Sequence, residues 1–340
     1  MVEYIFHIGM GKTGTSSIQK SLGANSQLLL DEKVFYAGML FGQIHEDYNT
    51  VIGTRFFLTR EPQENYGDHA KLFFEKTQEA AKAHGATKII ISNETIIGSI
   101  DHSFTFFEEL SKLAPTRFIA YIRNPYEWLP SAYAQWGLRH KVNKGPTRPF
   151  GELAASLVHQ YNPILTWAKK FPKNLDVRNF NKNVVNDFYK GLSLDVDVEE
   201  TRALQRPGRS ELYLRALYNN RFDEEVLPVK FQRELTFNRA DDIAKLDDSY
   251  EEFFSLKDNH RIVDSNMEVF KELKTRFGLD MTKPTEKTHP SSKIKSEMRD
   301  DLLDMVVDIS ISQSIFLHRM SKKVDRLEQE LREKNSDSEE

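Results

Sequence analysis

The chain has 340 residues, of which 39% are hydrophobic and 29% charged, and it carries a formal net charge of −4 with no cysteine. The lack of cysteine excludes disulfides, thiolate metal sites and a cysteine nucleophile, and the ten histidines show no metal-binding spacing, so we expect no metal. The acidic balance argues against nucleic-acid binding. With no apolar run of about 20 residues and no basic signal-peptide start, we expect a cytoplasmic globular protein without a membrane span.

The first third of the chain opens with a pattern typical of a βαβ unit. The apolar run Tyr4–Ile8 predicts a strand, a turn rich in glycine and hydroxyl residues follows, and a helix begins near Ile18. A second strand is expected over Lys33–Ala37, whereas residues 42–65 show little periodicity. An amphipathic helix is expected over Asp68–His84.

Three further apolar runs predict strands over Lys88–Ser92, Arg117–Ile122 and, more faintly, Leu175–Phe180. Helix-length segments separate these strands, which is typical of a parallel sheet covered on both faces. We therefore expect an α/β fold with three layers, like that of P-loop NTPases, in which helices flank a central parallel sheet of about five strands. Further helices are expected near Glu211–Asn219 and Asn266–Phe277.

The C-terminal region differs in composition from the rest. The α/β domain is expected to occupy residues 1–281, and a linker with two prolines follows over 282–295. Residues 296–334 contain no proline or glycine and predict one long amphipathic helix, and 335–340 a disordered tail. This helix could pack on its own domain or join copies of the chain in a homo-oligomer through a short coiled coil. Both interpretations remain open.

The turn within His7–Ser17 is the most informative segment. It places glycines, one lysine and several hydroxyl side chains between a strand and a helix N-terminus, where unpaired backbone N–H groups attract an anion. Lys12 precedes Gly14, whereas in a Walker A loop the lysine follows the last glycine. Gly9 and Gly11, together with Gly14, match a dinucleotide-binding spacing, but no acidic residue ends the next strand. A purely structural turn is a further alternative.

The string Gly11–Thr15 resembles the first cofactor loop of the sulfotransferases that use 3′-phosphoadenosine 5′-phosphosulfate (PAPS), in particular their carbohydrate and bacterial branches. In that family Lys-x-Gly-Thr-[Thr/Ser] follows the first strand. The family's second motif is an arginine at the end of a later strand and a serine eight residues further on, here Arg123 and Ser131. Two motifs in this order, each at a predicted strand end, are more specific than either one alone.

The resemblance covers about residues 1–280 and weakens after 190. Many relatives carry a second arginine where this chain has Trp128. The third cofactor loop has only a weak basic counterpart, Arg206–Arg209.

This resemblance implies an activity and a set of binding residues. PAPS would be bound without a metal, and a sulfuryl group would pass in line to a hydroxyl or amine of a carbohydrate or glycoconjugate, leaving 3′-phosphoadenosine 5′-phosphate (PAP). Arg123 and Ser131 would hold the 3′-phosphate, and Lys12 would stabilise the leaving 5′-phosphate. The residues that would cradle the 5′-phosphosulfate are Gly11, Lys12, Thr13, Gly14, Thr15, Ser16 and Ser17.

The acceptor needs a general base, for which Glu94 is the leading candidate. Glu94 follows a buried strand at the edge where open α/β sheets bind ligands, and similar sulfotransferases often have Ser-x-Glu there. Alternatively, Glu94 caps the next turn or pairs with a lysine. His45 is a second candidate base, while His7 is expected to be a core histidine within the first strand.

Two neighbouring groups of residues leave their roles open. The basic segment 137–149 could bind an anionic acceptor, act as a lid or be a solvated loop. Trp128, Tyr133 and Trp136 recur near helical spacing and are expected to be core rather than a sugar-stacking surface.

Two other functions are compatible with parts of the sequence. A P-loop kinase would need Mg²⁺ and an acidic residue at a strand end, where Lys88–Ser92 and the strand before Arg123 offer serine and arginine instead. A non-catalytic nucleotide-binding scaffold would assemble through the helix at 296–334.

Overall fold

The computed structural model describes residues 2–194, 196, 198–199, 209–234, 253 and 255–284, and twenty-odd positions between 302 and 329. The chain divides into two compact units. The first comprises Met1–Arg206 with Ala216–Thr288, and the second Pro207–Arg215 with His289–Glu340.

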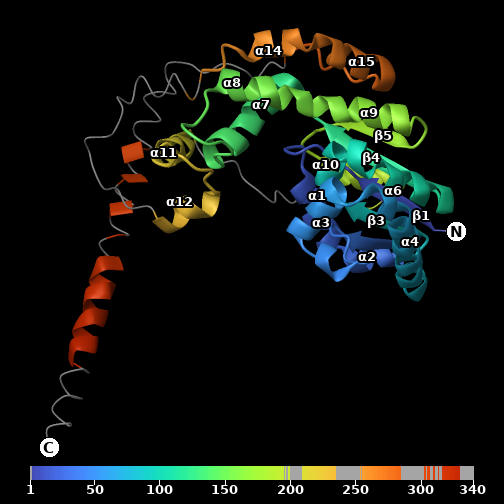
Figure 1. The fold of residues 1–340 in the computed structure, drawn as a ribbon, viewed down its shortest axis with the longest axis horizontal. Coiled ribbons are helices and arrows are strands. Elements are labelled where there is room, and N and C mark those ends of the chain that lie inside the picture. The colour runs from blue at the N-terminus through green and yellow to red at the C-terminus, as the bar shows by residue number, and fades with distance from the viewer. Residues whose placement is uncertain are drawn as a thin grey trace, which may run out of the picture. The chain divides into compact units, whose positions relative to one another are not determined.

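The first unit contains the expected α/β core (Figure 1). Five strands form one all-parallel sheet in the order β2-β3-β1-β4-β5. They are β1 (Glu3–His7), β2 (Val34–Gly38), β3 (Lys88–Ser92), β4 (Thr116–Ile122) and β5 (Leu175–Asn179). The prediction of a parallel sheet of about five strands flanked by helices is confirmed, and each strand lies within about one residue of its expected bounds.

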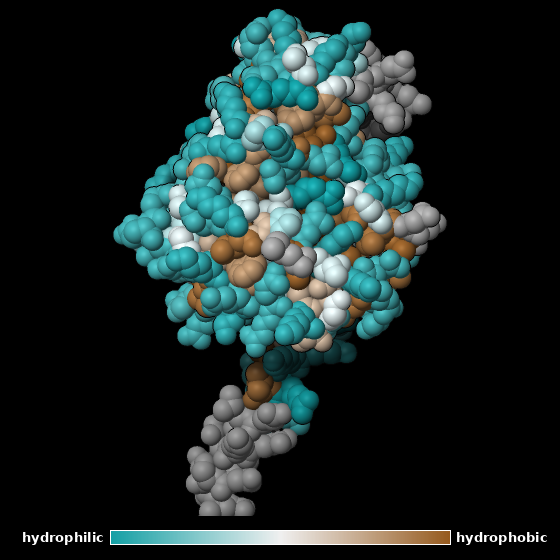
Figure 2. Space-filling model, turned by 90° about the vertical axis from the view of Figure 1, so that its right-hand side faces the viewer, coloured by the Kyte–Doolittle hydropathy of each residue, from teal (hydrophilic) through white to brown (hydrophobic). Residues whose placement is uncertain are grey.

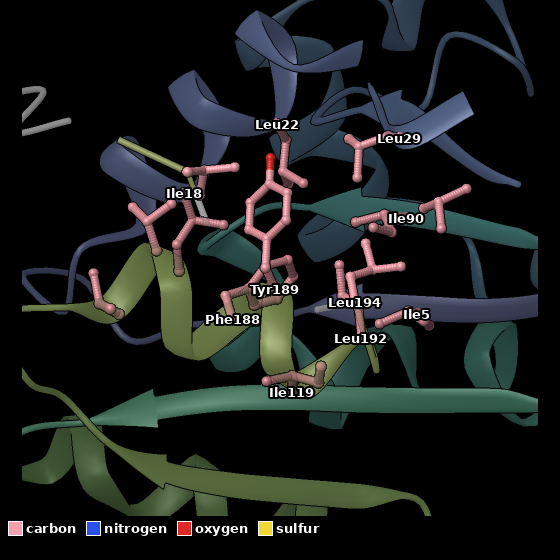
Figure 3. Close-up of a cluster of buried hydrophobic side chains, with 14 of the residues drawn as sticks. Ile5, Ile18, Leu22, Leu29, Ile90, Ile119, Phe188, Tyr189, Leu192 and Leu194 are labelled. Carbon is pink, nitrogen blue, oxygen red and sulfur yellow. The ribbon is translucent and has the colours of Figure 1, made fainter. Parts of the chain in front are cut away.

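Helices cover both faces of the sheet because every central strand is apolar on both sides. On one face Ile5 and Ile90 pack against α1 (Thr15–Ala24), α2 (Ser26–Asp31) and α10 (Val184–Gly191), as Figure 3 shows. On the other face, the rings of Tyr4, Phe6 and Phe118 make tilted or edge-on contacts with aromatic rings of α4 (Tyr66–Ala83), α6 (Ile100–Leu113) and α9 (Asn162–Lys170). The period of two along each strand thus separates a mainly aliphatic core, which also holds Tyr121, Phe188 and Tyr189, from a core rich in aromatic rings.

The segment 42–65, expected to be irregular, contains a helix. η1 (Glu46–Tyr48) precedes α3 (Val51–Arg60). The N-cap of α3 is Thr50, whose hydroxyl accepts a hydrogen bond from Gly53 N (2.9 Å). Apolar side chains of α3 point both inward, as at Phe57, and outward, as at Ile52. Because α3 has no single apolar face, its apolar residues do not recur every three to four positions, and the sequence shows no helical periodicity there.

The remaining elements of the described chain are helical. α5 (Thr95–Gly98) follows β3, and α7 (Pro125–Tyr133) continues without a break into a π-helical turn, η3 (Ala134–Arg139). The others are η2 (Gln63–Asn65), α8 (Phe150–Leu157), η4 (Val158–Tyr161), α11 (Arg209–Asn219), α12 (Pro228–Glu234), α14 (Asn259–Ser265) and α15 (Met267–Phe277).

The C-terminal segment is only partly covered. The described positions from 302 to 329 are helical, and the side chains of Phe316, Met320 and Leu327 are exposed. The helix predicted over 296–334 lies partly outside the described residues. Most of the linker expected over 282–295 and all of the tail over 335–340 lie outside the described residues. The face in Figure 2 is mainly hydrophilic, with apolar residues in small separate groups. None of the described helices is long and apolar enough to cross a membrane.

Candidate active site

The sequence motifs meet at the carboxyl edge of the sheet. The glycine turn follows β1, Glu94 lies two residues beyond β3, and Arg123 directly follows β4. Because β1 lies between β3 and β4 and all strands are parallel, these three segments are neighbours. The crossovers also change direction at β1, and the edge beside such a point is where open α/β sheets bind ligands.

The glycine turn is shaped as an anion site. Lys12 (φ 66°) and Gly14 (φ 86°) both adopt left-handed backbone conformations, and Gly14 is the N-cap of α1. A Cβ atom on Gly14 would lie 2.7 Å from Val184, so only glycine fits. α1 has no side-chain cap and no acidic residue in its first turn. Its N-terminal N–H groups and dipole therefore suit a negatively charged ligand.

The hydroxyl groups of the turn differ in availability. Thr13 is buried and its hydroxyl donates to the carbonyl of Met10, which stabilises the turn. Thr15 Oγ1 is buried without a partner, whereas Ser16 is exposed and Ser17 half-buried. The turn therefore offers a ligand its backbone N–H groups and the exposed hydroxyl of Ser16, while the Thr13 hydroxyl is already used within the turn.

Two tryptophans hold the turn from the side of α7. Trp128 is buried and its indole N–H donates to the carbonyl of Gly11 (2.8 Å). Trp136 lies against Gly11 so closely that an added Cβ would be 2.9 Å from its ring. Trp128 and Tyr133 are core residues, as expected, while Trp136 is only partly buried and forms a wall beside the turn.

Lys12 and Glu94, far apart in sequence, interact at this edge. Desolvation by the surrounding protein raises the pKa of Glu94, and the positive charge of Lys12 partly opposes this rise. More than a third of Glu94 is accessible to solvent. The Nζ of Lys12 also donates to Oε1 of Gln135 (3.4 Å).

Glu94 occupies the N-cap position of α5 but does not cap the helix with its side chain. Its side chain makes no capping hydrogen bond at the start of α5. The cap is Asn93, whose Oδ1 accepts from Thr95 N (2.8 Å) and whose amide donates to Met39 O (2.7 Å). Among the described residues no lysine or arginine lies within ion-pair distance of Glu94. The carboxylate is therefore left for another role.

Arg123 lies on the other side of the glycine turn, across an aromatic ring. Its guanidinium is 5.3 Å from the centre of the Phe180 ring, whose edge lies 3.2 Å from the Cβ position of Gly14. Its Nε and Nη2 donate to Glu127 (3.1 and 3.0 Å). Ser131 lies farther along α7 and is buried. The structure thus brings Arg123 near the turn.

Three residues of the site were not expected from the sequence: Phe180, Glu127 and Gln135. A fourth, Arg139, belongs to the basic segment 137–149, for which binding of an anionic acceptor was one of the open interpretations. Glu127 was detectable as the i+4 partner of Arg123 on a helix. Phe180, as the residue that ends a predicted strand, was a weaker signal. No local pattern marks Gln135.

The two histidines considered from the sequence, His7 and His45, differ in their surroundings. His7 is buried in the core, and its Nδ1 shares a hydrogen bond with Ser92 Oγ (2.8 Å), but its Nε2 has no partner and lies near Gly9. His45 is exposed and its Nδ1 accepts from Asp47 N (3.2 Å) at the start of η1. None of the described contacts of His45 involves Lys12 or Glu94.

Burial lowers the pKa of His7 from 6.5 to about 3. The unfolded chain therefore binds a proton below pH 6.5 that the folded chain does not, and stability falls as the pH falls from 6.5 toward 3. The expected loss from this residue is up to about 1.4 kcal/mol per pH unit. Urea unfolding between pH 7.5 and 5 should show a shallower acid dependence for His7→Asn than for wild type. The exposed His159→Asn control should keep the wild-type slope, and an unchanged slope in His7→Asn would contradict the assignment.

The basic segment 137–149 has mixed roles. Lys141 is buried and donates to the backbone carbonyls of Asn219 and Phe222, so it is structural. Lys144 is exposed beside Glu224 (3.8 Å). Residues 206–208 of the weak third basic motif lie outside the described residues.

Comparison with known proteins does not assign this chain to a family. The sequence matches no model of a known protein family, and a search of curated proteins found no match either. Among the described residues no cluster of three or more histidine or acidic side chains could hold a metal ion.

Proposed function

We propose that the protein is a PAPS-dependent sulfotransferase acting on a hydroxyl or amine of a carbohydrate or glycoconjugate. The observation that carries the proposal is the convergence of Lys12, on a left-handed glycine turn, with Glu94, a carboxylate of raised pKa. A cation and a general base at one strand edge are the two groups that sulfuryl transfer requires.

The two anion-binding elements suit the donor. PAPS supplies the sulfuryl group and has two separate anionic ends, the 5′-phosphosulfate and the 3′-phosphate. The N-terminus of α1 would take the first and Arg123 the second, with the ring of Phe180 between them. Arg123 keeps its second terminal nitrogen for a phosphate while the other two nitrogens bind Glu127.

In the proposed reaction, Glu94 and Lys12 have separate roles. The acceptor oxygen bonds to sulfur as the bond from sulfur to the 5′-phosphate oxygen breaks, and the proton of the acceptor passes to Glu94. Desolvation makes this carboxylate a stronger base than an ordinary glutamate. Lys12 stabilises the negative charge that develops on the leaving phosphate.

The proposal is tested by calorimetric titration with PAP, without metal, beside ATP with Mg²⁺. We expect micromolar binding of PAP alone, weakened about 10- to 100-fold by Arg123→Ala, because a charged hydrogen bond is worth about 1.5–3 kcal/mol. The matched control is Arg55→Ala, on the exposed side of α3. Binding of ATP with Mg²⁺ instead of PAP would indicate a kinase, and no binding of either would favour the scaffold.

A further inference from the structure

The π-helical turn η3 presents polar side chains to the glycine turn. Its widened geometry is marked by a hydrogen bond from His140 N to Gln135 O (2.9 Å). Gly137 and Leu138 are buried, with Gly137 against Tyr133, while Gln135 and Arg139 stay partly exposed. π-helical turns of this kind recur at functional sites because the extra residue re-aims side chains.

Two cations converge on one amide oxygen of this turn. Gln135 Oε1 accepts from Lys12 Nζ (3.4 Å) and from Arg139 Nη1 (3.5 Å). The two positive groups therefore lie within about 7 Å of each other and repel. In the described part of the chain Arg139 forms no ion pair, and its Nε is buried without a partner. A positively charged site with a hydrogen-bond donor that lacks a partner favours the binding of an oxyanion.

The position of Arg139 favours the acceptor over the donor. Phe180, over whose ring Arg123 lies, is next to Gly14, whereas Gln135, which binds Arg139, contacts Lys12. Lys12 is also the residue that interacts with Glu94, which removes the acceptor's proton in the proposed reaction. A group bound by Arg139 is thus beside the reacting hydroxyl, away from the proposed 3′-phosphate site.

We propose that Gln135 and Arg139 form a subsite for an acidic group, a carboxylate or sulfate, that the acceptor carries near the hydroxyl to be modified. This inference rests on the proposed sulfotransferase function. The guanidinium would leave Gln135 to bind the oxyanion through paired hydrogen bonds, which also satisfies the donor now without a partner. The acceptor class is then an acidic rather than a neutral glycan.

The test measures binding of an unsulfated chondroitin tetrasaccharide, which carries uronic acid carboxylates, against neutral maltotetraose. Titrations use the full chain saturated with PAP, in one buffer of fixed ionic strength. We expect wild type to bind the acidic tetrasaccharide at least tenfold more tightly than the neutral one. Arg139→Gln should abolish this preference and leave the dissociation constant of PAP within twofold of wild type.

Lys144→Gln is the matched control, because it removes an exposed charge from the same basic segment. It should keep the wild-type preference, and Arg139→Lys should restore part of it. An equal loss in Lys144→Gln and Arg139→Gln, no preference in wild type, or no binding of either sugar would overturn the subsite. Loss of PAP binding in Arg139→Gln would place Arg139 in the donor site instead. Failure of wild type to bind PAP would refute the proposed function separately.

Discussion

Replacing Lys12 with methionine is expected to lower the turnover number about 10²- to 10³-fold, the range for loss of one preorganised electrostatic contact. Lys12 is the cation that lies on the glycine turn and interacts with Glu94. Methionine keeps the length of the side chain and removes its charge. The effect should appear mainly in turnover, measured as transfer of labelled sulfate from PAPS to an acidic glycan, because the charge it stabilises develops during the reaction.

The folded state should survive this substitution. Lys12 already occupies a left-handed conformation, and methionine meets the same backbone cost there. The control is Lys20→Met, which removes an exposed charge on α1 and should leave turnover unchanged. Wild-type turnover in Lys12→Met, with an unaltered melting temperature, would refute the role of Lys12.

Replacing Glu94 with glutamine is expected to lower turnover about 10²- to 10⁴-fold, the contribution of a positioned general base. Glutamine keeps the shape of the side chain but cannot take a proton. In the wild type, activity should rise with pH through the raised pKa of Glu94, since only the carboxylate is a base. The substitution should remove this acidic limb from the pH profile of any residual activity.

The same substitution should stabilise the protein at neutral pH. A carboxyl group whose pKa is raised on folding favours its neutral form in the folded state, so it costs stability once the pH exceeds its unfolded pKa. Glu94→Gln removes this cost at pH 7, and the gain should vanish in acid, below the ordinary pKa of glutamate. Glu64→Gln, on an exposed turn, is the control for both measurements. Equal melting temperatures at all pH values, or wild-type turnover, would contradict the assignment of Glu94.

The sheet was predictable because its signals are local. Each buried strand is a short apolar run, such as Ile89–Ile91, and a run of that length between helical segments has one plausible structure. A turn between β1 and α1 was readable from its glycines, but the left-handed conformation of Lys12 was not. By contrast, α3 carries apolar side chains on two sides, as at Ile52 and Phe57. Its apolar residues therefore show no helical periodicity in the sequence, although the helix itself is regular.

The sequence by itself determined the α/β class, the strand positions and the three motif residues Lys12, Glu94 and Arg123, because these depend on near neighbours along the chain. Only the tertiary structure decided which of them meet. The strand order places β1 between β3 and β4, and so sets Lys12 beside Glu94. A single π-helical turn aims Gln135 at the same lysine across more than a hundred residues. Contacts of this kind follow from strand order and helix phase, which no local pattern encodes.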